Sequence, residues 1–267
     1  MELFQIFILA LIQGVTEFLP ISSSGHLILP SEVLNWPDQG LAFDIAVHVG
    51  TLAAVLIYFR KDVGQILWAW LAQFGAQGQT QYSRLGWYII VGTIPAGLAG
   101  LLFKDMIELH LRSGVVIAIA SIVFGLLLWW SDSTAKQNRA LAEMTLAAAI
   151  LIGIAQAFAL IPGTSRSGAT MTMALFVGLS RTDAARFSFL LSIPVIFLSG
   201  LLQGFELVNA PELDWLGIII GIGVSAVSAY ACIHFFLEFI AKVGMLPFVI
   251  YRIVLGLILL FIFSGYL

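Results

Sequence analysis

Two short polar segments interrupt an otherwise apolar sequence, and both carry side chains that could do chemistry. The first runs from Pro20 to His26 and reads Pro-Ile-Ser-Ser-Ser-Gly-His. Gln13 and Glu17 precede it, and they share a helix face because they are four residues apart. A serine hydroxyl is a weak nucleophile that needs a base to take its proton. Ser23 is therefore the candidate nucleophile. Glu17 and His26 are the candidate bases, and their spacing does not decide between them.

The second segment runs from Pro162 to Gly168 and reads Pro-Gly-Thr-Ser-Arg-Ser-Gly. Arg166 supplies a permanent cation on a planar group that fits phosphate oxygens. An arginine at mid-membrane depth costs roughly 2.5–3.5 kcal/mol on insertion scales, so a chain that keeps one is expected to use it. Serines suit helix N-caps, where free N–H groups favour an anion. The candidate substrate-binding residues are Gln13, Ser22, Ser24, Gly163, Thr164, Ser165, Ser167 and Gly168. A purely structural Glu17–Arg166 ion pair is the competing interpretation.

The composition predicts a membrane protein. Of 267 residues, 60% are hydrophobic and 10% are charged, whereas about 25% are charged in a typical soluble domain. Apolar runs close to the ~20 residues that span a bilayer recur along the chain. These runs are Leu41–Phe59, Trp87–Phe103, Gly114–Trp130, Phe187–Leu202, Leu216–Leu237 and Met245–Phe263. We therefore expect an all-α, polytopic membrane protein. The single cysteine cannot form an intrachain disulfide, and nothing indicates nucleic-acid binding.

Basic residues gather in alternate connections between the apolar runs. The positive-inside pattern places one set in the cytoplasm. This set is Arg60, Lys61, Arg84, Lys136, Arg139, Arg181, Arg186 and Lys242, and the other connections hold Lys104 and Arg112. Residues 1–36 then start and end outside, and residues 143–178 start and end in the cytoplasm. Each contains a helix-breaking segment, and non-helical backbone at membrane depth survives only inside protein or beside water. We therefore expect two re-entrant helical hairpins, one from each face.

The two halves of the chain resemble each other at a spacing of 143 residues. Gln13 falls on Gln156, and Ser22 falls on Ser165. Three crossings in each half would turn the second half upside down relative to the first, with a polar site near the midplane. We expect a single membrane domain, 1–267, built of two inverted-topology repeats. The first is residues 1–135 (hairpin 1–36 and three crossings), and the second is residues 143–267 (hairpin 143–178 and three crossings).

A few other polar residues lie within apolar sequence. His48 and Asp44 are four residues apart near the end of one crossing, and we do not expect them to take a direct part in the site. Arg252 is expected to be structural, either reaching the membrane surface or neutralising Glu238. Gln156 either forms hydrogen bonds within the second hairpin or belongs to the site.

On these residues the whole chain resembles the undecaprenyl-diphosphate phosphatase family, also called the bacitracin-resistance protein family. The first family signature is Glu or Gln, three residues, Glu, and then Pro-x-Ser-Ser-x-Gly-His. It reads here from Gln13 to His26. The second, Pro-Gly-x-Ser-Arg-Ser-Gly, reads from Pro162 to Gly168. Stretches 186–194 and 247–252 are also similar. Gln13 stands where many members have Glu, and its neutral amide is a poorer cation ligand.

The resemblance implies hydrolysis of undecaprenyl diphosphate, a C55 isoprenyl diphosphate, to the monophosphate and inorganic phosphate. This reaction recycles the lipid carrier of peptidoglycan synthesis, and so it serves cell-wall biogenesis, cell shape and bacitracin resistance. The resemblance also implies a multi-pass protein of the bacterial inner membrane with a site open toward the periplasm. It implies a divalent cation, Mg²⁺ or Ca²⁺, for which Glu17 and Gln13 are candidate ligands. The expected partners are the polyprenyl diphosphate and the lipid bilayer, and a homodimer is left open.

The resulting hypothesis is that Ser23 attacks the terminal phosphorus while Arg166 and its neighbouring serines hold the diphosphate. Three alternatives remain. Lipid phosphate phosphatases use a histidine six residues after an arginine, but Thr172 stands there and their Lys-x₆-Arg-Pro element is absent. A transporter or lipid flippase would also place polar breaks near the midplane, and phosphate release in detergent distinguishes it. A structural protein would have to retain Arg166 and Glu17 unused.

Overall fold

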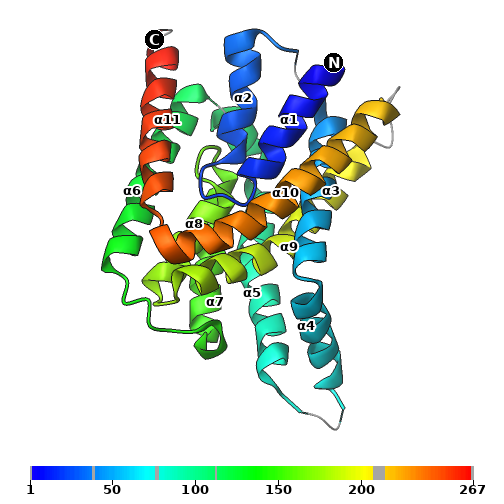
Figure 1. Cartoon of the computed structure of the whole chain (residues 1–267), viewed down its shortest axis with the longest axis vertical. Coiled ribbons are helices and arrows are strands. Elements are labelled where there is room, and N and C mark those ends of the chain that lie inside the picture. Colours follow the sequence, from blue (N-terminus) through cyan, green and yellow to red (C-terminus); the bar gives the residue numbers. More distant parts are fainter. Residues whose placement is uncertain (1, 38–39, 76–77, 112, 207–213, 266–267) are drawn as a thin grey trace.

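A computed structural model describes residues 2–37, 40–75, 78–111, 113–206 and 214–265, and within these ranges the regular secondary structure is helical apart from one isolated bridge. The α-helices are α1 (Leu3–Thr16), α2 (Ser23–Leu34), α3 (Gly40–Tyr58), α4 (Arg60–Ala72), α5 (Gln81–His110), α6 (Gly114–Thr134), α7 (Leu146–Ala157), α8 (Arg166–Phe176), α9 (Arg181–Glu206), α10 (Trp215–Val243) and α11 (Leu246–Ser264). Two short 3₁₀ helices, η1 (Leu141–Glu143) and η2 (Phe158–Leu160), flank α7. Figure 1 shows their arrangement.

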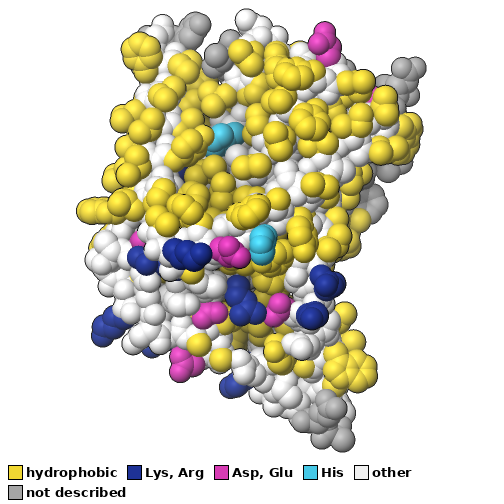
Figure 2. All heavy atoms as spheres, viewed as in Figure 1, with side chains coloured by type: hydrophobic (Ala, Val, Ile, Leu, Met, Phe, Trp, Pro, Cys, Tyr) yellow, Lys and Arg dark blue, Asp and Glu magenta, His cyan; other side chains and the backbone are white. Residues whose placement is uncertain are grey.

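Six of the described helices are long and apolar enough to cross a membrane. They are α3, the first part of α5, α6, most of α9, α10 and α11. Each matches one of the apolar runs of the sequence, so the prediction of an all-α, multi-pass membrane protein is confirmed. Figure 2 shows the consequence on one face of the molecule: hydrophobic side chains dominate, and a band of charged side chains crosses the surface toward the end that carries α4.

The two predicted hairpins correspond to pairs of short helices, α1–α2 and α7–α8. These helices have 14, 12, 12 and 11 residues, too few to cross a bilayer alone, since a crossing takes about 20. Figure 1 shows α1 and α2 at the end of the molecule where both termini lie, and α7 toward the opposite end. The re-entrant course and the inverted-repeat relation stay predictions. Arg112 and the side chain of Lys104 lie outside what the structure describes.

Helix α4 was not predicted. The stretch from Arg60 to Arg84 was expected to be a polar connection, but α4 occupies its first half and follows α3 directly after Phe59. Trp70 of α4 packs edge-on against Trp87 of α5, with ring centroids 5.4 Å apart. The apolar residues of α4 are too few to give a bilayer-length run, which is why a search for crossings does not find this helix.

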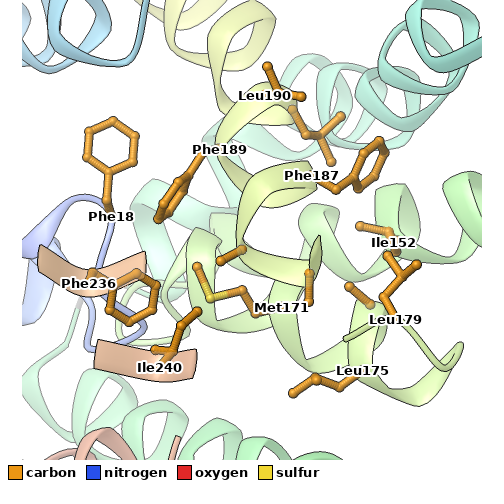
Figure 3. Close-up of a cluster of buried hydrophobic side chains, with 14 of the residues drawn as sticks. Phe18, Ile152, Met171, Leu175, Leu179, Phe187, Phe189, Leu190, Phe236 and Ile240 are labelled. Carbon is orange, nitrogen blue, oxygen red and sulfur yellow. The ribbon is translucent and has the colours of Figure 1, made fainter. Parts of the chain in front are cut away.

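The main buried core holds the turn after α1 against helices from both halves of the chain. Phe18, in the turn after α1, packs edge-on against Phe189 of α9, with ring centroids 5.2 Å apart. Phe189 also contacts Phe236 of α10, at 5.9 Å. Figure 3 shows Met171 of α8 in the same cluster. The core therefore fixes the turn between α1 and α2 against α8, α9 and α10.

Small residues allow α10 to approach α1 and α3 closely. A Cβ added to Gly14 of α1 would collide with Ser228 of α10, and one added to Gly50 of α3 would collide with Ser225. Small side chains at such contacts let membrane helices pack at short range, where van der Waals contacts hold them together. This packing holds α1, and with it the polar segment that follows, at a fixed position.

Candidate active site at the meeting of two helical turns

The first polar turn is built around Ser22. This residue has a positive φ of 71°, which is uncommon for a side chain other than glycine. It caps α2, and its hydroxyl accepts a hydrogen bond from the backbone N–H of Gly25 at 3.4 Å. It also bonds the hydroxyl of Ser24 at 3.1 Å. Ser23 is consequently the first residue of α2, at the end of the helix where free N–H groups favour an anion.

The second polar turn repeats this conformation around Ser165. Its φ is 69°, its hydroxyl accepts from the backbone N–H of Gly168 at 3.1 Å, and it bonds Ser167 at 3.1 Å. Arg166 is the first residue of α8, the position that Ser23 has in α2. The spacing of 143 residues seen in the sequence therefore relates two turns of the same geometry.

The two turns touch each other. Ser167 donates a hydrogen bond to the backbone carbonyl of Leu19 at 2.7 Å, and the backbone N–H of Gly163 donates to Ser24 at 3.4 Å. The hydroxyl oxygen of Thr164 is buried beside them and has no hydrogen-bond partner within the part of the chain described. The N-terminal ends of α2 and α8 thus meet, although they are far apart in sequence.

A carboxylate and a guanidinium lie at this meeting point. Glu17 Oε1 accepts from Arg166 Nη2 at 2.7 Å, and Glu17 Oε2 accepts from Ser23 Oγ at 3.2 Å. The Glu17 side chain is 8% exposed and that of Arg166 is 13% exposed, so both charges are held away from bulk solvent. Arg166 also donates to the carbonyl of Ser188 at 3.3 Å and lies over the ring of Phe18 at 5.8 Å. The predicted nucleophile, one candidate base and the predicted anion clamp are therefore in contact.

Gln13 connects Glu17 to His48, a residue that the sequence did not assign to the site. Gln13 Nε2 lies 3.0 Å from Glu17 Oε2 and 3.1 Å from His48 Nε2. His48 Nδ1 donates to the carbonyl of Asp44 at 2.7 Å, so the free lone pair on Nε2 can accept from the amide. His48 therefore borders the site, a position that its place in the sequence did not predict. Its only signal in the sequence was a histidine within an apolar crossing.

His26 lies on the same helix as Ser23 but faces a different partner. Its Nδ1 lies 2.7 Å from the carbonyl oxygen of Ser22, and its Nε2 lies 2.6 Å from the hydroxyl of Tyr251. The two rings are stacked, with centroids 5.5 Å apart and an interplanar angle of 5°. A carbonyl only accepts, so Nδ1 carries the proton and Nε2 accepts from tyrosine. Both nitrogens are engaged away from Ser23, which bonds Glu17 instead.

Arg252 has a role that the sequence prediction missed. It is fully buried, and all its hydrogen-bond acceptors in the described part of the chain are backbone carbonyls. The carbonyls belong to Ser121 (3.1 Å), Pro20 (3.2 Å), Gly163 (3.0 Å) and Thr164 (2.8 Å). The expected surface position or neutralising partner was wrong. One guanidinium instead holds the backbone of both polar turns and ties them to α6.

The structure also places two other residues that the sequence singled out, Gln156 and Thr172. Gln156 is 1% exposed and donates to the carbonyl of Gly92 at 3.4 Å, so it joins α7 to α5 rather than to the Glu17 cluster. Thr172, which stands where a lipid phosphate phosphatase would need histidine, is buried and donates to the carbonyl of Gly168 at 2.7 Å. It is a helix-internal hydroxyl and cannot replace the histidine nucleophile of a lipid phosphate phosphatase.

The cluster contains oxygen atoms that could bind a divalent cation if phosphate oxygens of the substrate supplied further ligands. Among the described residues no group of three or more His, Cys, Asp or Glu side chains could hold a metal alone. Mg²⁺, however, is commonly bound by one or two carboxylates together with substrate phosphates. Glu17 supplies a carboxylate, and the neighbouring Gln13 Oε1 is buried without a hydrogen-bond partner in the part that the structure describes. These two groups fit such an ion.

Comparison with known proteins finds one family and several relatives of nearly the same length. The family described as bacitracin resistance protein BacA matches residues 6–258. An undecaprenyl-diphosphatase of Teredinibacter turnerae is 62% identical over 260 residues, covering 97% of this chain and 98% of that protein. Undecaprenyl-diphosphatase 1 of Pseudoalteromonas translucida is 59% identical over 257 residues, covering 96% and 97%. An undecaprenyl-diphosphatase of Alteromonas mediterranea is 59% identical over 266 residues, covering 99% and 100%.

Proposed function

The chain belongs to the bacitracin resistance protein BacA family, and we propose that it is an undecaprenyl-diphosphatase that releases inorganic phosphate and undecaprenyl phosphate. Relatives of nearly the same length carry the name of that activity. The observation that carries the proposal is the contact of Ser23 and Arg166 with the same buried carboxylate, that of Glu17. The product would be the lipid carrier of cell-wall synthesis in the bacterial inner membrane, ready for reuse.

The two polar turns form the diphosphate site in this proposal. The guanidinium of Arg166 pairs with phosphate oxygens, and the free N–H groups at the starts of α2 and α8 add further donors. Ser165, Ser167 and the unpartnered hydroxyl of Thr164 lie on the same turn. Phosphoryl transfer depends mainly on positioning and on charge stabilisation. A site with preformed donors from two helix ends supplies both.

Ser23 is the nucleophile, and Glu17 is its base. The Ser23 O–H bond breaks as its oxygen attacks the terminal phosphorus, and the proton passes to Glu17 Oε2, 3.2 Å away in the structure. The bond between that phosphorus and the bridging oxygen breaks, and undecaprenyl phosphate leaves. Glu17 passes its proton to the departing undecaprenyl phosphate. Water then attacks the phosphorus of the phosphoserine and gives a proton to Glu17. The bond between Ser23 Oγ and phosphorus breaks, and Glu17 returns the proton to Oγ as inorganic phosphate leaves. Glu17 is preferred to His26 because the histidine nitrogens bond Ser22 and Tyr251.

The alternative role of Glu17, in place of that of base, is to hold Mg²⁺ or Ca²⁺ beside the diphosphate together with Gln13. The ion, when bound, would offset negative charge on the phosphate oxygens. The amide of Gln13 then has a second task, because its N–H groups bond both Glu17 and His48. This pairing keeps the Gln13 side chain in place, with its orphan oxygen available to a cation.

We further infer that the molecule consists of two inverted repeats whose hairpins enter the membrane from opposite faces. The equal conformations of the Ser22 and Ser165 turns support this relation. The distribution of basic residues supports an orientation with the site open toward the periplasm. The exposed apolar surface would lie in lipid, and the prenyl chain would lie against it. A homodimer is compatible with this arrangement and is not required by it.

Phosphate release in detergent tests the proposed activity. Purified protein would be given C55 and C15 prenyl diphosphates, with and without a metal chelator. We expect inorganic phosphate from the C55 substrate and its loss when chelator is present. Phosphate release in a detergent solution excludes a protein that only moves lipid, because detergent leaves no bilayer across which to transport. No phosphate release with metal present would contradict the proposal.

A further inference from the structure

A second polar groove lies away from the Glu17–Arg166 cluster. It encloses about 620 Å³ between the end of α6 and the connection that follows α8. Its lining includes Trp130, Lys136, Arg139 and Phe176, and none of the residues that line it is acidic. Two cations and two aromatic rings thus share one surface hollow that the proposed reaction does not use.

The basic side of the groove is held in a defined shape. Gln137 has a positive φ of 48°, and its side-chain amide donates to the carbonyl of Asp132 at 3.0 Å, which fixes the turn that carries Lys136. The backbone N–H of Arg139 donates to Gly178 at 3.0 Å, and its carbonyl accepts from Ser180 at 3.1 Å. The loop is therefore bonded to both neighbouring elements, so its cations are presented together.

These cations keep donors for an anion. Arg139 Nη1 donates to the carbonyl of Val177 at 3.2 Å, which uses one of the five N–H donors of a guanidinium. Lys136 and Arg139 are both exposed. Asp132, near the end of α6, is bound to Arg181 by bonds of 2.6 and 3.1 Å, so its charge is already neutralised. Glu143, on the connection after α6, accepts from the backbone N–H of Ala140 and does not line the groove. The groove is positively charged as a result.

The opposite side of the groove is aromatic and lies at the end of a membrane-crossing helix. Trp130, near the end of α6, is 54% exposed and packs edge-on against Phe176, with ring centroids 5.3 Å apart. Helix α6 is one of the apolar spans, and it ends at Thr134. Tryptophan is enriched where a membrane surface meets water. Trp130 therefore marks the level of lipid headgroups, and Lys136 lies just beyond it.

We propose that this groove binds the headgroup of an anionic phospholipid. The phosphate pairs with Lys136 and Arg139, and the start of the acyl chains lies against Trp130 and Phe176. Basic pockets at the ends of membrane helices favour anionic lipid in this way, by charge attraction near an apolar surface. The site is distinct from the one that handles the prenyl diphosphate, because it is built from α6, α8 and their following loops.

Native mass spectrometry of the purified protein with phosphatidylglycerol, and separately with phosphatidylcholine, tests the proposal. We expect the wild type to retain phosphatidylglycerol in preference to phosphatidylcholine. The double variant Lys136→Ala/Arg139→Ala should bind phosphatidylglycerol about 25-fold more weakly, at about fivefold for each lost charge. Arg60→Ala/Lys61→Ala is the matched control, because it removes one exposed arginine and one exposed lysine outside the groove.

The control double variant should keep phosphatidylglycerol binding within about twofold of the wild type, since exposed charges outside the groove contribute little to a specific site. Equal weakening in both double variants would mean that the lipid responds only to total charge, and it would overturn the proposal. Unchanged binding in Lys136→Ala/Arg139→Ala would do the same. The thermal unfolding temperature of each double variant shows whether it is folded. All four substituted side chains are exposed.

Discussion

The Glu17 carboxylate lies where several polar side chains converge. Arg166 bonds one of its oxygens, while Ser23 and Gln13 bond the other. His48 Nε2 is 3.9 Å from that second oxygen. An arrangement of this kind gives one group two tasks: it neutralises the clamp that holds the anion, and it can take the proton of the nucleophile. Loss of its charge should therefore lower the rate of phosphate release, and it also leaves the Arg166 guanidinium without its carboxylate partner.

Glu17→Gln tests this double role. The amide keeps the shape of the side chain but can no longer act as a base, and base catalysis contributes about 10²–10⁴-fold. We expect the rate of phosphate release by the purified variant to fall within that range. Glu238→Gln is the control, because this exposed carboxylate pairs only with His234, at 3.7 Å, among the described residues. A Glu17→Gln enzyme within about fivefold of the wild type would exclude Glu17 as the base.

Tyr251→Phe separates the two candidate bases. The substitution keeps the ring that stacks on His26 and removes the hydroxyl that bonds its Nε2. If His26 only supports the turn, the loss should be at most about fivefold, the equivalent of one neutral hydrogen bond. The dependence of kcat on pH should also keep its shape. A shifted pH profile in Tyr251→Phe would assign the proton transfer to His26.

At the scale of elements, two helical turns of equal geometry are held together by a third element. Arg252 of α11 donates to backbone carbonyls in both turns, including Pro20 and Gly163. The sequence showed that both segments break their helices, because proline and glycine stand there. It did not show how the breaks are satisfied. The partners lie in remote parts of the chain, and a local pattern carries no information about them.

Arg252→Met should destabilise the protein by at least about 3 kcal/mol, because it leaves several buried carbonyls without donors at about 1–3 kcal/mol each. We expect a lower unfolding temperature in detergent and slower phosphate release. Arg252→Lys should recover only part of the unfolding temperature and part of the rate of phosphate release. An ammonium lacks the planar fork that reaches several carbonyls. Lys242→Met removes an exposed cation from α10 as the control. An Arg252→Met protein as stable as that control would show that the two turns keep their structure without Arg252.

For the whole molecule, the sequence predicts the crossings well and the connections poorly. Apolar runs of bilayer length identified all six candidate spans because lipid imposes that length directly. Helix α4 was missed because it is short and its apolar face is mixed with polar residues. His48 was left out of the site for another reason: it lies inside a crossing, and only the packing of α3 beside α1 brings it to Gln13.

The inverted-repeat account predicts which connections face each side of the membrane. In a Cys232→Ser background, Ser113→Cys should react with a membrane-impermeant maleimide added to the periplasmic side of the inner membrane. Lys136→Cys should react only after the membrane is opened, because its connection belongs to the basic set assigned to the cytoplasm. Both positions are exposed in the structure. Labelling of both from the periplasmic side would contradict the assigned topology.

The central claim is that Ser23 attacks the diphosphate at the meeting of the two turns. Its most direct test is the rate of phosphate release from undecaprenyl diphosphate by purified Ser23→Ala, compared with Ser31→Ala. Ser31 lies on the same helix, and its hydroxyl bonds only the carbonyl of Ile28 within the described structure. We expect Ser23→Ala to lose at least about 100-fold and Ser31→Ala to stay close to the wild type. A Ser23→Ala enzyme as active as Ser31→Ala would contradict the account.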